Sequence, residues 1–169
     1  RLCVVQLSRG DGTADVVQIG PNPNAPNLAR VLADPDVTKI FHFARFDLAV
    51  LSLRLGVMPQ PVYCTKIASK LVRTYTDRHG LKDLSRELLG IDMSKAQQSS
   101  DWAAETLSQA QLDYAASDVL HLHALKARLD AMLAREGRAD LAEACFRFLP
   151  TRARLDLAGW DETDIFAHA

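Results

Sequence analysis

The fold is decided by the stretch Val37-Thr38-Lys39-Ile40-Phe41-His42-Phe43, which runs directly into Ala44-Arg45-Phe46-Asp47-Leu48-Ala49-Val50-Leu51. The first part is rich in β-branched and aromatic residues and predicts a buried strand. The apolar spacing of the second part favours a helix. Asp47 therefore falls in the first turn of a helix that follows a strand, and ligands of open α/β sheets collect at the carboxyl ends of strands. Alternatively, Asp47 is an ordinary first-turn acid favoured by the helix dipole.

A second informative stretch is Leu112-Asp113-Tyr114-Ala115-Ala116-Ser117-Asp118-Val119. Tyr114 and Asp118 are one helical turn apart and would lie on the same face. The apolar neighbours that would seat this face against a core are Leu112, Ala115, Val119 and Leu122. A carboxylate held there is costly unless a positive group, such as a metal ion, neutralises it, and a nearby tyrosine can orient or deprotonate a water. The alternative is a half-buried aromatic residue beside a solvated acid.

Composition limits the possible classes of protein. The chain has 169 residues, enough for one domain with a real core, and its formal net charge is −1. This charge argues against binding to long duplexes through many phosphates, but it allows a short or single-stranded substrate. Cys3, Cys64 and Cys145 are widely spaced and predict reduced thiols in an intracellular protein. The sequence contains no apolar stretch of membrane-spanning length and no signal sequence, so we expect a cytoplasmic protein without membrane contact.

The remaining pattern indicates an α/β protein. Strands are expected at 1–7, 15–19 and 62–64. Helices are expected at 27–32, capped by Asn27, at 44–55, at 65–73, capped by Thr65, and at 81–89, ended by Gly90. Further along, a polar loop at 94–102 precedes a long helical region at 108–135 and a short helix at 139–148.

Several motifs together resemble the ribonuclease D-like branch of the DEDD 3′–5′ exonucleases, the subgroup with tyrosine in its third motif. The matching segments are Lys39 to Asp47, Cys64-Thr65-Lys66-Ile67-Ala68, His79-Gly80-Leu81-Lys82-Asp83-Leu84, Lys95 to Trp102, and Tyr114-Ala115-Ala116-Ser117-Asp118. The resemblance covers nearly the whole chain. It implies an α/β fold of the ribonuclease H-like (DnaQ-like exonuclease) type, with a mixed sheet flanked by helices, and a single exonuclease domain over residues 1–169.

Within this family the chain resembles a short alphaproteobacterial subgroup that lacks the helical accessory domains of full ribonuclease D. The segment from Thr74 to Gly80 and the tail from Leu149 to His168 share in this likeness. The resemblance implies cleavage of very short single-stranded RNA, namely dinucleotides, to mononucleotides. It also implies a homo-oligomer, described for the subgroup as a ring-shaped octamer. Activity on longer RNA or on single-stranded DNA is the alternative within the family.

The family's chemistry assigns roles to the acids. Two divalent ions stabilise the charge that builds on the attacking and leaving oxygens of a phosphodiester. Mg²⁺ or Mn²⁺ suits carboxylate ligands, and the sequence has no Cys/His cluster that would select zinc. The resemblance implies that Asp118 and Asp47 bind these metals. It also implies that Tyr114 positions the attacking water.

Substrate contacts are expected from residues of the matching motifs. Those assigned to substrate binding are His42, Lys66, Lys95, Gln98, Ser100 and Trp102. A core histidine at position 42 and a structural Trp102 are equally open alternatives. Arg73 is a further candidate for the 5′ side of a short substrate, and Arg78 with His79 for a contact across a subunit boundary. Trp160 and Phe166 are expected to be buried in a core or at a subunit interface.

One departure concerns the family's first motif, an Asp-x-Glu pair on a strand that would lie shortly before Leu2. The sequence begins at Arg1 and does not contain it. We therefore expect these 169 residues to be part of a longer chain, because loss of a central strand would leave its neighbours unpaired. The alternatives are a catalytically dead nucleic-acid-binding module and a plain oligomeric scaffold in which the acids are incidental.

Overall fold

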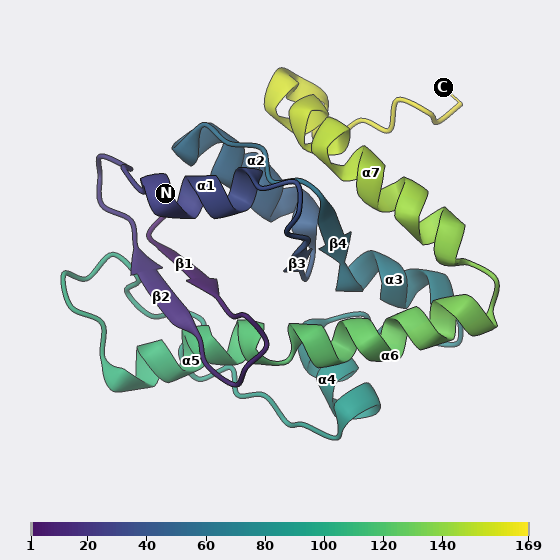
Figure 1. Ribbon diagram of the computed structural model, residues 1–169, viewed down its shortest axis with the longest axis horizontal. Helices are drawn as coiled ribbons and strands as arrows, with labels where there is room; N and C mark the ends of the chain where they lie inside the picture. The colour runs from purple at the N-terminus through teal and green to yellow at the C-terminus, as the bar shows by residue number, and fades with distance from the viewer. Residues whose placement is uncertain (1, 169) are drawn as a thin grey trace.

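The computed structural model describes residues 2–168 as an α/β arrangement of short strands and longer helices (Figure 1). Its elements in chain order are β1 (Val4–Leu7), β2 (Asp15–Gln18), α1 (Pro26–Ala33), β3 (Lys39–Phe41), α2 (Ala44–Leu55), β4 (Val62–Cys64), α3 (Thr65–Val72), α4 (Leu81–Leu89), α5 (Gln109–Leu120), α6 (Leu122–Arg135), α7 (Ala139–Leu155) and a wider final turn, η1 (Asp156–Trp160). None of the helices within residues 2–168 is long and apolar enough to cross a bilayer.

The strands form two small sheets. β1 pairs antiparallel with β2, and β3 pairs in parallel with β4 across the α2 crossover. Antiparallel and parallel pairing are both present, and within residues 2–168 β1 and β3 are not hydrogen-bonded to each other. The two pairs are separate in the ribbon diagram (Figure 1). Residues of both β1 and β3 line one cavity.

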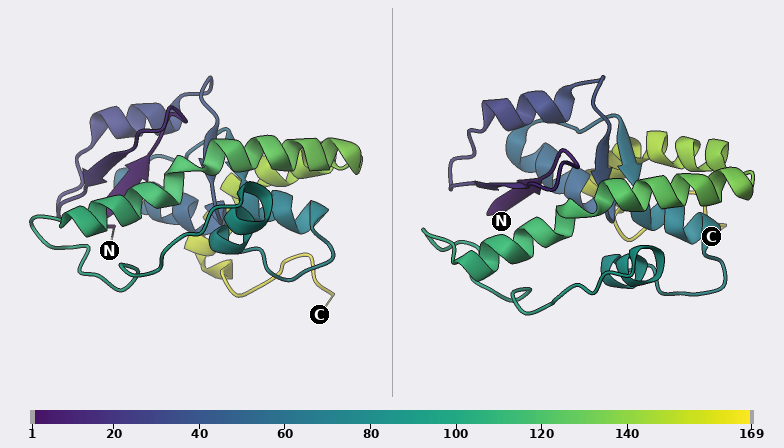
Figure 2. Two further views of the ribbon diagram at one scale, coloured as in Figure 1. Left: turned by 90° about the horizontal axis from the view of Figure 1, so that it is seen from below. Right: turned by 60° about the horizontal axis from the view of Figure 1, so that its bottom comes forward.

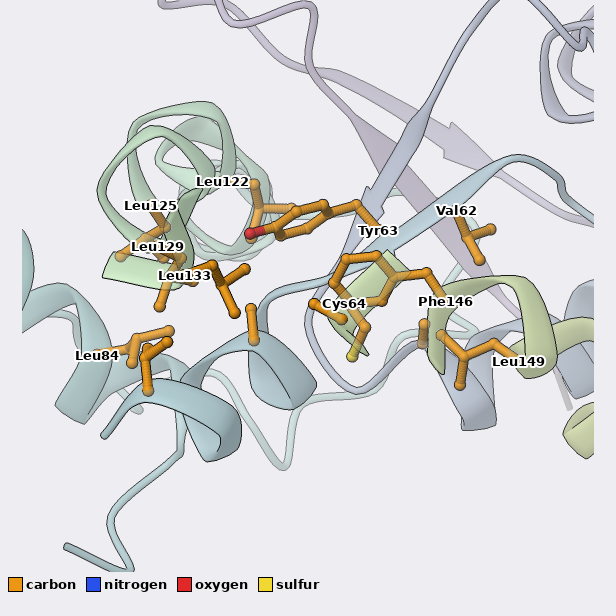
Figure 3. Close-up of a cluster of buried hydrophobic side chains, with 14 of the residues drawn as sticks. Val62, Tyr63, Cys64, Leu84, Leu122, Leu125, Leu129, Leu133, Phe146 and Leu149 are labelled. Carbon is orange, nitrogen blue, oxygen red and sulfur yellow. The ribbon is translucent and has the colours of Figure 1, made fainter. Parts of the chain in front are cut away.

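Two hydrophobic clusters meet at α2. The larger one contains the fully buried Leu48, Leu84, Leu125 and Leu129, contributed by α2, α4 and α6 (Figure 3). The smaller one lies beneath β1, β2 and α1 and includes Leu51 of α2. Because α2 is anchored in both clusters, the side chains of its first turn are held in a fixed position.

Several predicted boundaries are confirmed. The helices expected at 44–55 and 81–89 and the strand at 62–64 appear with these bounds. Gly90 ends α4 in a left-handed conformation, with φ 69°. Ser108 caps α5 by accepting a hydrogen bond from the Gln111 backbone, and the Gln111 side chain returns a bond to the Ser108 backbone.

Other boundaries were wrong. The helical region at 108–135 is broken at His121, where φ −109° and ψ 0° leave the helical range, so that α5 and α6 follow one another with a bend (Figure 2). The last helix does not stop at Phe148 but continues through Pro150 to Leu155. Pro150 costs one backbone hydrogen bond, but burial of Pro150 and Ala153 on the same helix offsets this cost.

Both predicted side-chain caps were also wrong. α1 starts at Pro26 with Ala25 as its cap residue, because the fixed φ of proline suits the first helical position. Thr65 is the first residue of α3, and its hydroxyl donates to the Phe41 carbonyl oxygen at 3.2 Å. Thr65 therefore ties α3 to the end of β3.

Candidate active site

A cavity of about 950 Å³ lies between the two sheets, with walls from β1, β3, α1, α2, α5 and the start of α6. We call it the inter-sheet cavity. Five of the residues predicted from sequence line it, and they come from three separate stretches of the chain: His42, Asp47, Trp102, Tyr114 and Asp118. The structure therefore gathers the predicted acids and the tyrosine around one space.

Asp47 reaches the inter-sheet cavity from the first turn of α2. Burial alone raises the pKa of its carboxyl to about 6. Within residues 2–168 it forms no ion pair. A desolvated carboxylate without a cation is costly, so the site is electrostatically incomplete without a positive ligand.

Tyr114 and Asp118 enter the inter-sheet cavity from α5. Burial raises the pKa of the Asp118 carboxyl. Both side chains line the same cavity, and the pKa of Tyr114 is raised by burial and by the negative charge of Asp118. At neutral pH Tyr114 is consequently protonated and its hydroxyl can donate a hydrogen bond.

Trp102 is held beside this pair by the cap of α5. The buried Gln111 side chain donates to the Asp101 carbonyl oxygen at 3.0 Å and so fixes the preceding loop. The ring of Trp102 lies 5.9 Å from that of Tyr114, tilted by 39°. This contact gives Trp102 a structural role in packing Tyr114 while it also faces the cavity.

His42 follows β3 directly and forms a hydrogen bond between Nδ1 and the Thr65 hydroxyl oxygen at 2.9 Å. Burial, with a smaller effect of the Lys66 ammonium, lowers the pKa of His42 to about 4. The imidazole is therefore neutral at pH 7. A neutral ring is a poor partner for a phosphate charge, so a contact of His42 with a phosphate is not favoured.

The other substrate-binding predictions do not meet in the inter-sheet cavity. Lys66 lines a neighbouring pocket, with its ammonium 4.4 Å from the centre of the Phe43 ring. Lys95, Gln98 and Ser100 lie on the loop before α5 and are absent from the cavity lining. Their roles stay predictions.

Arg73 was wrongly expected to offer charge to substrate. Its side chain is only 1% exposed and forms an ion pair with Glu87. It also donates to the Ser69 hydroxyl at 3.0 Å and to the Arg78 carbonyl oxygen. Arg73 thus organises the turn after α3, because its charge is satisfied within the fold.

Two aromatic residues of the tail were expected to lie in a core or at a subunit interface, and they do not lie in the core of this chain. Trp160 is 47% exposed and Phe166 is 75% exposed. Phe166 only covers the ring of Phe148, at 5.8 Å. Neither belongs to the core of this chain.

Sequence reasoning missed Phe46, which precedes Asp47 and lines the inter-sheet cavity although it is 63% exposed. A large apolar side chain in the polar first turn of α2 was the signal that could have identified it. Its position beside Asp47 makes it a candidate surface for a base.

The carboxylates fit a hard divalent cation. Asp47 and Asp118 are the acids in the lining of the inter-sheet cavity, and within residues 2–168 no group of three or more His, Cys, Asp or Glu side chains is placed to hold a metal ion. Oxygen ligands of this kind suit Mg²⁺ or Mn²⁺ and not zinc. Two side chains do not fill the coordination shell, so further ligands must complete it.

The fold is the ribonuclease H-like fold of the DnaQ-like exonucleases. Residues 1–134 match the family described as "3'-5' exonuclease". The chain belongs to this family.

Known proteins of this type are similar over most or all of the chain. Ribonuclease D of Granulibacter bethesdensis is 41% identical over 137 residues, which is 81% of this chain and 34% of that protein. The chain thus spans about a third of the length of the curated relatives it matches. Brucella melitensis NrnC with bound Mg²⁺ is 66% identical with a TM-score of 0.96, covering all of this chain and 83% of that one. NrnC bound to pGG is 68% identical with a TM-score of 0.95, covering 100% and 82%.

Proposed function

We propose that this protein is a metal-dependent 3′–5′ exoribonuclease that cleaves very short RNA, above all dinucleotides, to mononucleotides. The observation that carries this proposal is the meeting of Asp47, Tyr114 and Asp118 in one cavity of a chain 68% identical to an NrnC structure bound to pGG. The Mg²⁺ bound in the related NrnC structure supports Mg²⁺ or Mn²⁺ as the cofactor.

In the proposed mechanism, Asp118 and Asp47 hold two divalent ions. These ions, when bound, supply charge stabilisation to the attacking and leaving oxygens. Tyr114 is protonated and orients the attacking water by hydrogen bonding. Trp102 keeps the phenol ring in place, and the apolar walls exclude bulk water.

His42 has a different proposed role from the one expected. The Thr65 hydroxyl donates to the Phe41 carbonyl oxygen, so its oxygen accepts from Nδ1–H of His42. This tautomer leaves Nε2 as an acceptor. A ribose hydroxyl is the donor that fits it, since the 2′-hydroxyl distinguishes RNA from DNA.

We propose further that a strand carrying two acids, supplied from outside these 169 residues, completes the site. The edges of β1 and β3 that line the inter-sheet cavity are available for pairing within residues 2–168. A strand inserted there would join both sheets into one and add carboxylates beside Asp47 and Asp118. The exonuclease domain would then consist of that strand and residues 1–169.

Self-association and a cytoplasmic location belong to the same proposal. The tail exposes Leu157, Trp160, Ile165 and Phe166, and such apolar clusters mark interaction surfaces. A homo-oligomer, an octamer by the family resemblance, would bury them. The unpaired thiols of Cys64 and Cys145 agree with a reducing compartment.

The proposed substrate is tested by digestion with the full-length protein. A 5′-labelled dinucleotide and a ladder of longer RNAs and single-stranded DNAs are incubated with Mn²⁺, and the products are resolved by gel. We expect the dinucleotide to be converted fastest and EDTA to stop the reaction. Faster stepwise trimming of long strands would instead show a general ribonuclease D-like enzyme, and absence of cleavage at every length would refute the proposal.

A second prediction concerns Tyr114. Tyr114→Phe removes the hydroxyl that orients the water, and we expect kcat on the dinucleotide to fall about 100-fold. KM and Mn²⁺ affinity should change little, because the ring and both acids are retained. Tyr75→Phe is the matched control, since that hydroxyl bonds to Glu87 on a different surface. Unchanged kcat in Tyr114→Phe would exclude the proposed role.

A further inference from the structure

A second pocket lies between the start of α2, α3 and α7, and it shares no lining residue with the inter-sheet cavity. We call it the α3–α7 pocket. Its volume is about 530 Å³, within the range of small-ligand sites. Its walls are mainly apolar, and its basic residues are Arg45, Lys66, Lys70 and Arg152. No acidic side chain lines it.

The two arginines of the α3–α7 pocket share one carboxylate. Arg45 and Arg152 both donate to the carboxylate of Asp156, at 2.7 and 2.6 Å. Lys66 and Lys70 are one turn apart on α3 and form no ion pair with any carboxylate of residues 2–168. Two lysines one turn apart on the same helix, both lining an apolar pocket, favour an anion.

Aromatic side chains provide the second feature. Phe148 and Phe43 line the α3–α7 pocket, and they are 37% and 46% exposed. Phe43 has φ 66°, a left-handed conformation that a bulky residue rarely adopts. Strained residues of this kind concentrate at ligand sites. Here the conformation keeps the ring out of the core and at the pocket wall, beneath the Lys66 ammonium.

Aromatic surfaces beside phosphate-binding amines are the components of nucleotide recognition. We propose that the α3–α7 pocket binds a free nucleoside 5′-monophosphate, with the base against the phenylalanine rings and the phosphate at Lys66 and Lys70. This ligand is the product class of the proposed nuclease, and the choice of a nucleotide over other aromatic anions rests on that proposed function. Lys66 also acts electrostatically on His42 of the inter-sheet cavity. A phosphate bound at Lys66 would therefore change the electrostatic potential at His42.

The test measures binding of GMP to the full-length protein by calorimetry, without metal. Ala144→Phe fills the α3–α7 pocket and should abolish binding, whereas Lys70→Glu should weaken it about tenfold or more. Arg147→Glu makes the same change of charge as Lys70→Glu, but on α7, the helix of Ala144. The Arg147 side chain is 70% exposed and outside the lining, so this variant should stay within about twofold of wild type. Guanosine and inorganic phosphate, which each carry half of the ligand, should bind more weakly than GMP.

Asp118→Asn separates this site from the catalytic one. GMP binding that is unchanged by Asp118→Asn and lost in Ala144→Phe supports the proposal, whether or not the protein cleaves RNA. GMP binding that survives both pocket variants, or no GMP binding at all, overturns it. If Lys70→Glu weakens the binding of a 5′-phosphorylated dinucleotide but not the binding of GMP, the pocket is part of the substrate-binding site. That result would refute a separate site for the free nucleotide.

Discussion

Asp118→Asn in the full-length protein should lower the rate of Mn²⁺-dependent dinucleotide cleavage by about 1,000-fold or more. Asp118 lies in the inter-sheet cavity beside Tyr114, where its charge is desolvated. Loss of a carboxylate that holds a catalytic metal removes several kcal/mol of transition-state stabilisation, and each 1.4 kcal/mol is about tenfold in rate. Single-turnover cleavage of the labelled dinucleotide, with Mn²⁺ titrated over a wide range, measures this loss.

Asp113→Asn is the matched control for Asp118→Asn. Asp113 lies on the same helix, is exposed, and bonds only to Gln109 at 2.8 Å. Its replacement should leave cleavage within about twofold of wild type, as expected for surface changes. Thermal melting of the metal-free proteins should show that Asp118→Asn folds at least as stably as wild type, because a desolvated charge has been removed. Full activity of Asp118→Asn would refute the assignment of Asp118.

The parts of the candidate site that could be predicted are those determined by the local sequence pattern. Asp47 follows a strand and opens a helix, and Tyr114 and Asp118 are one turn apart in an apolar helix. Period and position in the helix determine which way these side chains point. The same local signals gave the bounds of α2, β4 and α4.

Other features depend on distant contacts and could not be read from the sequence. Arg73 looks like a surface cation, but Glu87 and the turn at Arg78 bury it. Pro150 favours the end of a helix, but α7 continues beyond it to Leu155 because the helix is packed against its neighbours. The Lys66 ammonium lies over the ring of Phe43, a residue in a left-handed conformation that its sequence does not predict. Tertiary packing overrides local preference in each case.

The second large effect concerns the pH dependence of stability without metal. The pKa of Asp47 is about 6 in the fold against 3.8 for the free group, so the native state binds this proton more tightly. Between these values stability due to Asp47 falls as pH rises, because the unfolded state binds fewer protons. His42 has the opposite sense, since its pKa falls to about 4 from 6.5 and protonation of the unfolded chain destabilises the fold at low pH. A plot of the wild-type free energy of unfolding against pH therefore does not separate the two contributions.

The difference between Asp47→Asn and wild type isolates the carboxylate. We expect this difference in the free energy of unfolding to rise from near zero at pH 4 to about 2 kcal/mol in favour of the variant at pH 7. Urea unfolding at a series of pH values in EDTA measures it, with Asp113→Asn as a control whose difference should stay flat. Saturating Mg²⁺ should reverse the sign at pH 7, since wild type then gains binding free energy that the variant lacks. A flat difference for Asp47→Asn would mean that the carboxylate is solvated or paired, and that its desolvation is no reason to place a cation beside it.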